Sequence, residues 1–208
     1  SPQPKIDPPE PWPRRGRFVS GFGAQSVPED APFLDSDAWP DLDWEQLEDH
    51  YAMQKAPFDQ HVPPAAYATS ADWAAATRRY QAELVRHHVE ALRRLKYRPT
   101  GGVALYLLAD SAPGVTWSVL SYDRRPKEAY AALAAACAPV VVIADRPPDH
   151  VHAGEPLAWD VHVVSDLRTP LGEVQVTATL TAPSGERRFG WVGDVEADDC
   201  VRVGTIRT

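Results

Sequence analysis

The sequence has few of the features that mark several common classes of protein. It contains only two cysteines among 208 residues, Cys137 and Cys200. Two are too few for a disulfide framework, so we expect free thiols, which favour a cytoplasmic location. Apolar residues make up 44% of the chain, but no apolar run approaches the roughly 18 residues of a membrane-spanning helix. The sequence therefore predicts a soluble globular protein with no membrane partner.

The chain also lacks an excess of positive charge and a recognisable metal motif. Its 21 Lys and Arg face 29 Asp and Glu, for a net charge of -8, so no basic stripe is available to bind nucleic acid. The adjacent His87 and His88 cannot share one helix face. Of the later histidines, His150, His152 and His162 have no carboxylate at ligand spacing. We expect no nucleic-acid partner, no metal and no other cofactor.

The beginning of the sequence is unusual. It starts at Ser1, with no initiator methionine, and opens with the proline-dense stretch "SPQPKIDPPEPWPRRG". We expect a piece of a longer chain, so the lack of a targeting segment here excludes no compartment.

After this opening, the pattern predicts short strands that alternate with helices. "RFVSGFGA" reads as a short strand closed by glycines, and Asp43 can cap a helix of about three turns that ends before Pro57. Residues 57–69 read as a loop because prolines interrupt the periodicity. A long helix then begins at Thr69 or Ser70, with apolar residues at intervals of three, four or seven.

Two further segments repeat the order of strand and helix. The apolar run "VALYLLAD" suits a parallel strand that is covered on both faces. A loop and the alanine-rich helix "KEAYAALAAACA" follow it, and then the apolar "PVVVIADRPP". This is the order of (β/α) units, and two such units are visible.

From about residue 150 the pattern changes to alternation with a period of two. "EPLAWDVHVVSDL", "GEVQVTATLTAPSG" and "ERRFGWVGDV" predict three strands, with turns at 168–172 and 183–185. Such strands are typical of an antiparallel sandwich. The segment is shorter than the roughly 100 residues of a complete immunoglobulin-like sandwich, so we expect only part of one.

Several of these segments resemble the C-terminal part of glycoside hydrolase family 2 proteins of the β-mannosidase-like group. The matching stretches, in order, are "RFVSGFGAQSVP", "RRYQAELVRHHVEALRRLKYRPTGG", "VTWSVLSYDRRPKEAYAALAAACAPVVV" and "GEPLAWDVHVVSDLRTPLGEVQV". The resemblance implies α/β plus all-β architecture. Residues 1–147 would be strand 7 to helix 8 of a (β/α)8 TIM barrel, and 148–208 the first strands of an immunoglobulin-like β-sandwich. It also implies two partners, a terminal β-linked sugar and the remainder of the barrel.

The resemblance further implies that the catalytic carboxylates are missing. Retaining glycosidases use two carboxylates about 5–5.5 Å apart, one as nucleophile and one as acid/base. In the family the acid/base glutamate comes from strand 4, which this chain does not contain. The nucleophile lies in a Ser-Glu-Phe-Gly motif, which here reads Ser20, Gly21, Phe22, Gly23. Gly21 occupies the nucleophile position and has no side chain, so no catalytic residue is expected.

The strand-8 motif of the family, Trp-Gln-Leu-Asn-Asp with a Trp-Pro beyond it, is also altered. Asp110, Pro113 and Trp117 match the pattern, and Tyr106 replaces an aromatic residue. Small or apolar residues replace sugar contacts at three positions, Leu107, Ala109 and Ala112. An engineered knock-out would leave these neighbours intact, so long divergence explains the pattern better.

Four residues remain as candidate substrate-binding residues: Tyr106, Asp110, Trp117 and Gln25. Each has an alternative. Trp117 can be a packing residue, Asp110 can cap the turn before Pro113, and Gln25 can bond to loop backbone. Three functions stay open at this point. The parent protein hydrolyses O-glycosyl bonds in carbohydrate metabolism, or it is a carbohydrate-binding or regulatory pseudoenzyme, or the chain is a purely structural fragment.

Overall fold

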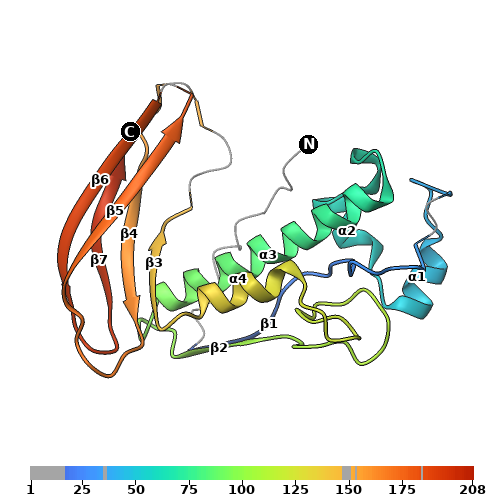
Figure 1. Ribbon diagram of the computed structural model, residues 1–208, viewed down its shortest axis with the longest axis horizontal. Helices are drawn as coiled ribbons and strands as arrows, with labels where there is room; N and C mark the ends of the chain where they lie inside the picture. Colours follow the sequence, from blue (N-terminus) through green and yellow to red (C-terminus); the bar gives the residue numbers. More distant parts are fainter. Residues whose placement is uncertain (1–16, 35–36, 147–150, 153, 184) are drawn as a thin grey trace.

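A computed structural model describes residues 17–34, 37–146, 151–152, 154–183 and 185–208. Helices with a small parallel sheet occupy one end of the molecule, and antiparallel strands occupy the other (Figure 1). The strand-and-helix pattern and the later period-two pattern thus fall in separate regions, as the sequence predicts.

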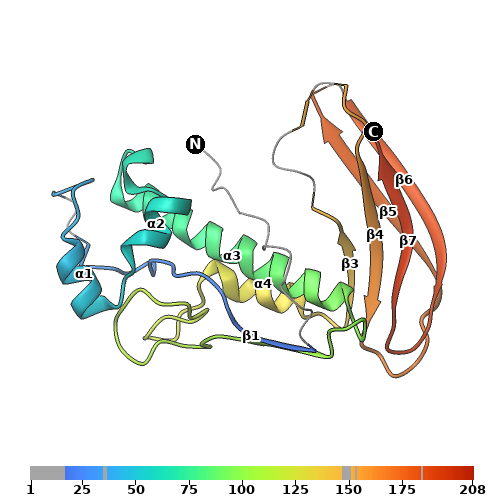
Figure 2. The same ribbon diagram turned by 180° about the vertical axis from the view of Figure 1, so that it is seen from behind.

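The first region is built on two parallel strands, β1 (Phe18–Phe22) and β2 (Gly102–Leu105). Parallel neighbours need a long crossover connection, and the 25-residue helix α3 (Ser70–Arg94) supplies it. Helix α4 (Glu128–Ala136) follows β2 and packs beside α3. Figures 1 and 2 show both helices along the same side of the two strands. Apolar residues of the strands and helices, among them Phe22, Val89, Leu92 and Ala136, form the core between them.

Helix α3 begins and buries its side chains as its sequence predicts. The Thr69 side chain accepts a hydrogen bond from the backbone N–H of Asp72 at 3.1 Å, which satisfies one of the unpaired N–H groups of the first turn. Trp73, Tyr80 and Leu84 follow one another at intervals of seven and four residues and are buried. The predicted cap and the predicted core face of α3 are both confirmed.

The segment before α3 is more helical than expected. Asp43 caps helix α1 (Trp44–Tyr51), as predicted, and accepts from the Gln46 N–H at 3.0 Å. The expected loop at 57–69 is wrong, because it contains most of helix α2 (Lys55–His61) and the 3-10 turn η1 (Pro64–Ala66). Proline is tolerated in the first turn of a helix, where its missing N–H would have no partner. Pro57 lies in that turn of α2, and Pro64 opens η1.

Strand β2 is shorter than its apolar run. It ends at Leu105, and Leu107 has a φ of 67°, a conformation that interrupts a strand. Beyond this point the backbone bonds within its own loop: the Leu120 N–H donates to the Leu108 carbonyl at 2.9 Å. Apolar residues 106–108 are therefore exposed at the end of the strand, and the expectation of a strand covered on both faces along its whole run is not met.

The C-terminal region contains two antiparallel sheets. One has the order β3-β4-β7 and the other is the β5-β6 hairpin. Their bounds are Val140–Ala144 for β3, Ala158–Ser165 for β4, Gly172–Ala182 for β5, Gly185–Val195 for β6 and Cys200–Arg207 for β7. The three predicted strands correspond to β4, β5 and β6. Val161, Val163, Val176 and Val195 are buried in one cluster, so the two sheets share a core.

Strand β3 connects the two regions along the chain. It pairs with β4, with Val140 opposite Ser165 and Ala144 opposite Val161. By its hydrogen bonds β3 belongs with the C-terminal sheets, although it lies inside the range 1–147 that we assigned to the first domain.

Charged side chains tie the end of α3 to the C-terminal sheets. Lys96 Nζ donates to the Ser165 carbonyl at 2.8 Å and to Asp166 at 2.6 Å, and it also forms an ion pair with Asp198. Arg93 bonds to Asp166 at 2.8 Å. Burial opposes the charge of Lys96, but its hydrogen bonds to the two carboxylates outweigh this and raise its pKa. The two regions are therefore joined by a partly buried polar network.

Both cysteines are free. In the part of the chain that the structure describes, no helix has the length and apolar character needed to cross a membrane.

Candidate functional site

The C-terminal end of β1 contains a bulge at Gly21. Ser20 lies opposite Ala104 and Phe22 lies opposite Leu105, so Gly21 is an extra residue without a partner in β2. Its φ is 74°, in the left-handed region that glycine adopts without steric strain. A Cβ atom built at Gly21 would meet nothing within 4 Å. The position has room for a side chain, but its backbone conformation favours glycine.

Two of the candidate binding residues come together next to this bulge. The rings of Tyr106 and Trp117 meet edge to face, with centroids 5.8 Å apart. Trp117 also lies against Gly23, where a Cβ atom would be 3.7 Å from its ring. Tyr106 is 51% exposed and Trp117 is half-buried. An aromatic surface therefore lies at the ends of β1 and β2, and Trp117 both packs against the loop and remains partly accessible.

Asp110 is instead buried in a polar cluster. Its carboxylate accepts a hydrogen bond from Thr116 Oγ1 and lies 3.5 Å from Lys127 Nζ. Lys127 also donates to Ser118 Oγ at 3.0 Å. Burial lowers the pKa of Lys127, and the Asp110 carboxylate acts in the opposite direction. Asp110 thus balances the buried charge of Lys127, a partner that its position in the sequence did not indicate.

The polar side-chain atoms of Gln25 also form hydrogen bonds within the protein. Its side chain is buried, and its amide nitrogen donates to the carbonyls of Ala52 at 2.6 Å and Val115 at 2.7 Å. Its Oε1 accepts from the Gln54 N–H at 2.8 Å. Gln25 therefore ties together three backbone segments, including the loops that follow β1 and β2, and both of its N–H groups are used.

A second buried side-chain amide also forms hydrogen bonds with the loops that follow β1 and β2. Gln81, on α3, accepts from Ser26 Oγ at 2.7 Å and donates to the carbonyls of Ala24 and Ser118 at 2.9 and 3.0 Å. The sequence did not single out Gln81, because its partners are 37 to 57 residues away. The loops around the site are thus fixed by buried side-chain amides.

The described residues contain no group of three or more His, Cys, Asp or Glu side chains suited to hold a metal ion. His150, one of the histidines considered from the sequence, lies outside the described residues.

Comparison with solved structures agrees with this arrangement. The β-D-mannosidase from Dictyoglomus thermophilum superposes on 91% of this chain with a TM-score of 0.67 and 20% sequence identity. The chain has the fold of part of a β-mannosidase. It covers 23% of the length of that enzyme. The predicted resemblance to β-mannosidase-like proteins is confirmed in fold.

Other solved structures share part of this β-mannosidase-like fold. The exo-chitosanase CsxA from Amycolatopsis orientalis matches 68% of this chain and 16% of its own, with a TM-score of 0.54 and 18% identity. A variant of that protein in complex with PNP-β-D-glucosamine matches with a TM-score of 0.53. No protein-family model and no curated protein matches the sequence.

Proposed function

We propose that the chain forms the last (β/α) units of a family 2, β-mannosidase-like glycosidase barrel and the first strands of an immunoglobulin-like sandwich. Two neighbouring parallel strands, β1 and β2, support this, because each leads to a helix that packs on the same side of the sheet. The antiparallel sheets that follow fit the start of a sandwich. Since β3 pairs with β4, we place the boundary between the two domains just before Val140, rather than after residue 147.

The conclusion about function depends on Gly21. In the proposed barrel, the end of β1 is where a retaining glycosidase carries its nucleophile, and here the backbone forms a left-handed bulge without a side chain. A covalent glycosyl-enzyme intermediate needs a carboxylate at this point. We therefore propose a carbohydrate-binding pseudoenzyme site that does not hydrolyse glycosides.

The candidate residues divide between two roles in this proposal. Tyr106 and Trp117 present an aromatic surface to the sugar, because both lie at the strand ends and are accessible. Asp110 and Gln25 hold the loops, because their polar atoms bond within the protein. The proposed partners are a terminal β-linked sugar and the rest of the barrel. Nucleic acid and membranes are not among them, and the free thiols favour the cytoplasm.

The second candidate function is hydrolysis of O-glycosyl bonds by the parent protein, with a carboxylate from another position in place of the lost nucleophile. The resemblance in fold to two glycosidases favours it. The strand-8 segment argues against it. Leu107 is 38% exposed with a φ of 67°, in a segment where the family has polar and aromatic sugar contacts.

Restoring the missing groups distinguishes the two functions. We would measure kcat/KM on aryl β-mannoside and β-glucoside for three forms of the protein carrying its upstream barrel segments. They are the natural sequence, Gly21→Glu, and Gly21→Glu combined with Ala109→Asn and Ala112→Trp. We expect no turnover from the first and little or none from the second, because a glutamate at φ 74° is strained and the sugar is poorly held.

Hydrolysis by the natural sequence would contradict the pseudoenzyme and support the second function. Full activity from Gly21→Glu alone would show that the bulge and the strand-8 changes do not impair the site. A gain only in the triple variant would support long divergence at both strand ends.

A further inference from the structure

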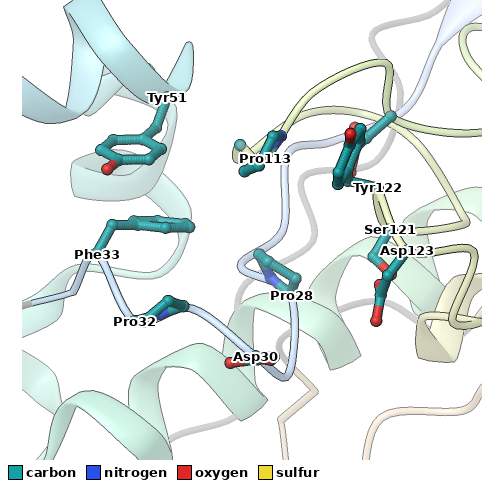
Figure 3. A pocket seen from close by; sticks show the side chains of 11 residues that line it. Pro28, Asp30, Pro32, Phe33, Tyr51, Pro113, Ser121, Tyr122 and Asp123 are labelled. Atoms are coloured by element: carbon teal, nitrogen blue, oxygen red, sulfur yellow. The ribbon is translucent and has the colours of Figure 1, made fainter.

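A separate cavity of about 410 Å3 lies between the loop after β1 and the loop after β2. Its size falls in the range of roughly 300–1,000 Å3 that is usual for small-molecule sites. Neither Tyr106 nor Trp117 lines it, so it is distinct from the aromatic surface at the strand ends. Figure 3 shows it open between two groups of rings.

The cavity has apolar walls on two sides. On one side the rings of Phe33 and Tyr51 stack with centroids 4.1 Å apart and an interplanar angle of 17°. On the other side lie Tyr122, which is 52% exposed, and Pro113 (Figure 3). Because Phe33 and Tyr51 stack on each other, they turn mainly ring edges towards the opposite wall. Apolar walls on two sides still suit a ring-shaped ligand with C–H groups, and the exposed Tyr122 ring can also attract a cation.

The walls are held at a fixed distance by the backbone. The Val115 N–H donates to the Tyr51 carbonyl at 2.8 Å, and a Cβ atom at Gly114 would lie only 3.0 Å from the same carbonyl oxygen. Gln25 bonds to the carbonyls of Ala52 and Val115, the residues next to these two. The cavity is therefore formed before a ligand arrives.

The charged side chains that line the cavity in the described part of the chain are all carboxylates. Three carboxylates line it, those of Asp30, Asp110 and Asp123, and no lysine or arginine is among the described residues that do so. Asp110 is balanced by the buried Lys127, and Asp123 pairs with Arg125 at 2.6 Å where both side chains are exposed. Asp30 is exposed and has no ion pair or hydrogen-bond partner in the described part of the chain. It is the carboxylate available to a cation.

We propose that this cavity binds a protonated amino sugar. The ring lies between the Phe33–Tyr51 pair and Tyr122, and its ammonium group approaches the Asp30 carboxylate. Asp30 supplies the preference for a cation, and the two aromatic walls supply the preference for a ring. That the ring belongs to a sugar rests on the proposed function. The site is a binding pocket and carries out no chemistry.

The test compares two sugars that differ in charge. The protein carrying its upstream barrel segments is immobilised at low density, and glucosamine and N-acetylglucosamine are titrated by surface plasmon resonance at about pH 6, where the amine is protonated and carboxylates are ionised. We expect glucosamine to bind about fivefold or more tightly than N-acetylglucosamine, because an exposed ion pair contributes up to about 1 kcal/mol. Cyclohexylamine, a ring amine without hydroxyl groups, is expected to bind more weakly than glucosamine.

Variants then locate the site. Asp30→Asn should weaken glucosamine binding about fivefold and leave N-acetylglucosamine unchanged, whereas Tyr122→Ala should weaken both sugars. Asp194→Asn on β6 and Tyr130→Ala on α4 replace exposed residues of the same types that do not line the cavity, and they should change neither affinity.

Equal affinities for the two sugars, or no effect of Asp30→Asn, would overturn the proposal. Binding of cyclohexylamine as tight as that of glucosamine would overturn the assignment to a sugar. These outcomes are separate from those of the hydrolysis experiment: a protein that hydrolyses mannosides can still bind glucosamine here, and an inactive protein can fail to bind it.

Discussion

At the scale of single residues, the proposed loss of catalysis depends on Gly21. A side chain at this position has free space around it, so the constraint on Gly21 is the backbone and not the packing. Gly190, on β6, provides a comparison, because a Cβ atom there also meets nothing within 4 Å, but its φ does not lie in the left-handed region. The two glycines therefore separate the effect of conformation from the effect of space.

We predict that Gly21→Ala lowers the free energy of unfolding by about 1–2 kcal/mol, since alanine is strained at a positive φ. Gly190→Ala should be neutral or slightly stabilising, because alanine restricts the unfolded chain more than glycine does. Urea denaturation of both variants measures the difference. Equal effects would mean that Gly21 is not held in the left-handed conformation.

His88 provides a prediction about pH. Its ring meets Phe22 edge to face at 5.5 Å, and burial, with a smaller contribution from His87, lowers its pKa to about 4. In the unfolded chain the pKa is about 6.5, so between these values the unfolded state binds more protons than the folded state. The contribution of His88 to stability is therefore complete above about pH 6.5 and is lost as the pH falls towards 4.

Between pH 6.5 and 4 we expect the free energy of unfolding of the natural protein to fall by about 1–2 kcal/mol more than that of His88→Gln. This figure allows for the part of the ring that water reaches. His50→Gln, which replaces an exposed histidine on α1, should keep the natural slope. Urea denaturation across this range measures all three proteins. Parallel curves for the natural protein and His88→Gln would contradict the assigned shift.

At the scale of elements, the sequence predicts a helix well when neighbouring residues reveal its cap and its buried face. The start of α3 follows from Thr69 and Asp72, and its buried face follows from spacing alone. The sequence does not predict helix α2, because Pro57 interrupts the helical periodicity there, although a proline is tolerated in the first turn of a helix. The pairing of β3 with β4 depends on contacts across about 20 residues, which spacing does not reveal.

The sequence predicts the site only in part for the same reason, because contacts between distant segments cannot be inferred from spacing. The resemblance predicts Gly21 near the end of one strand, and the structure has it in β1, one residue before the last. Tyr106 and Trp117 meet beyond the end of β2, and their role in binding stays a prediction. The resemblance could not separate the buried roles of Asp110 and Gln25 from binding roles, since their partners come from distant loops.

The junction between elements gives a further prediction. Lys96 is 10% exposed in its side chain and bonds to Ser165, Asp166 and Asp198. We expect Lys96→Met to lower the free energy of unfolding by about 1–3 kcal/mol, because it leaves partly buried acceptors without their donor. Arg86→Met removes an exposed pair with Glu90 on the same helix and should change stability by less than about 0.5 kcal/mol. Calorimetry of both variants measures this, and an equal small effect would mean that the network does not join the two regions.

At the scale of the whole molecule, the chain has the fold of less than a quarter of a β-mannosidase. In the part that the structure describes, β1 and β2 pair only with each other, and Phe18 and Leu108 are 64% and 62% exposed. Further parallel strands on either side would cover such residues, as in a closed barrel. This is the physical reason for proposing the remainder of a barrel as a partner of this region.

The central claim is that the end of β1 has no nucleophile. The most direct test is intact-mass measurement after incubation with 2-deoxy-2-fluoro-β-mannosyl fluoride. Fluoride leaves without an acid catalyst, so this reagent reports on the nucleophile alone, and the β-mannosidase from Dictyoglomus thermophilum serves as the positive control. We predict no added fluoromannosyl group on this protein under conditions that label the control enzyme fully. A stoichiometric adduct on any carboxylate of the chain would contradict the account and identify the residue that had taken over the role of nucleophile.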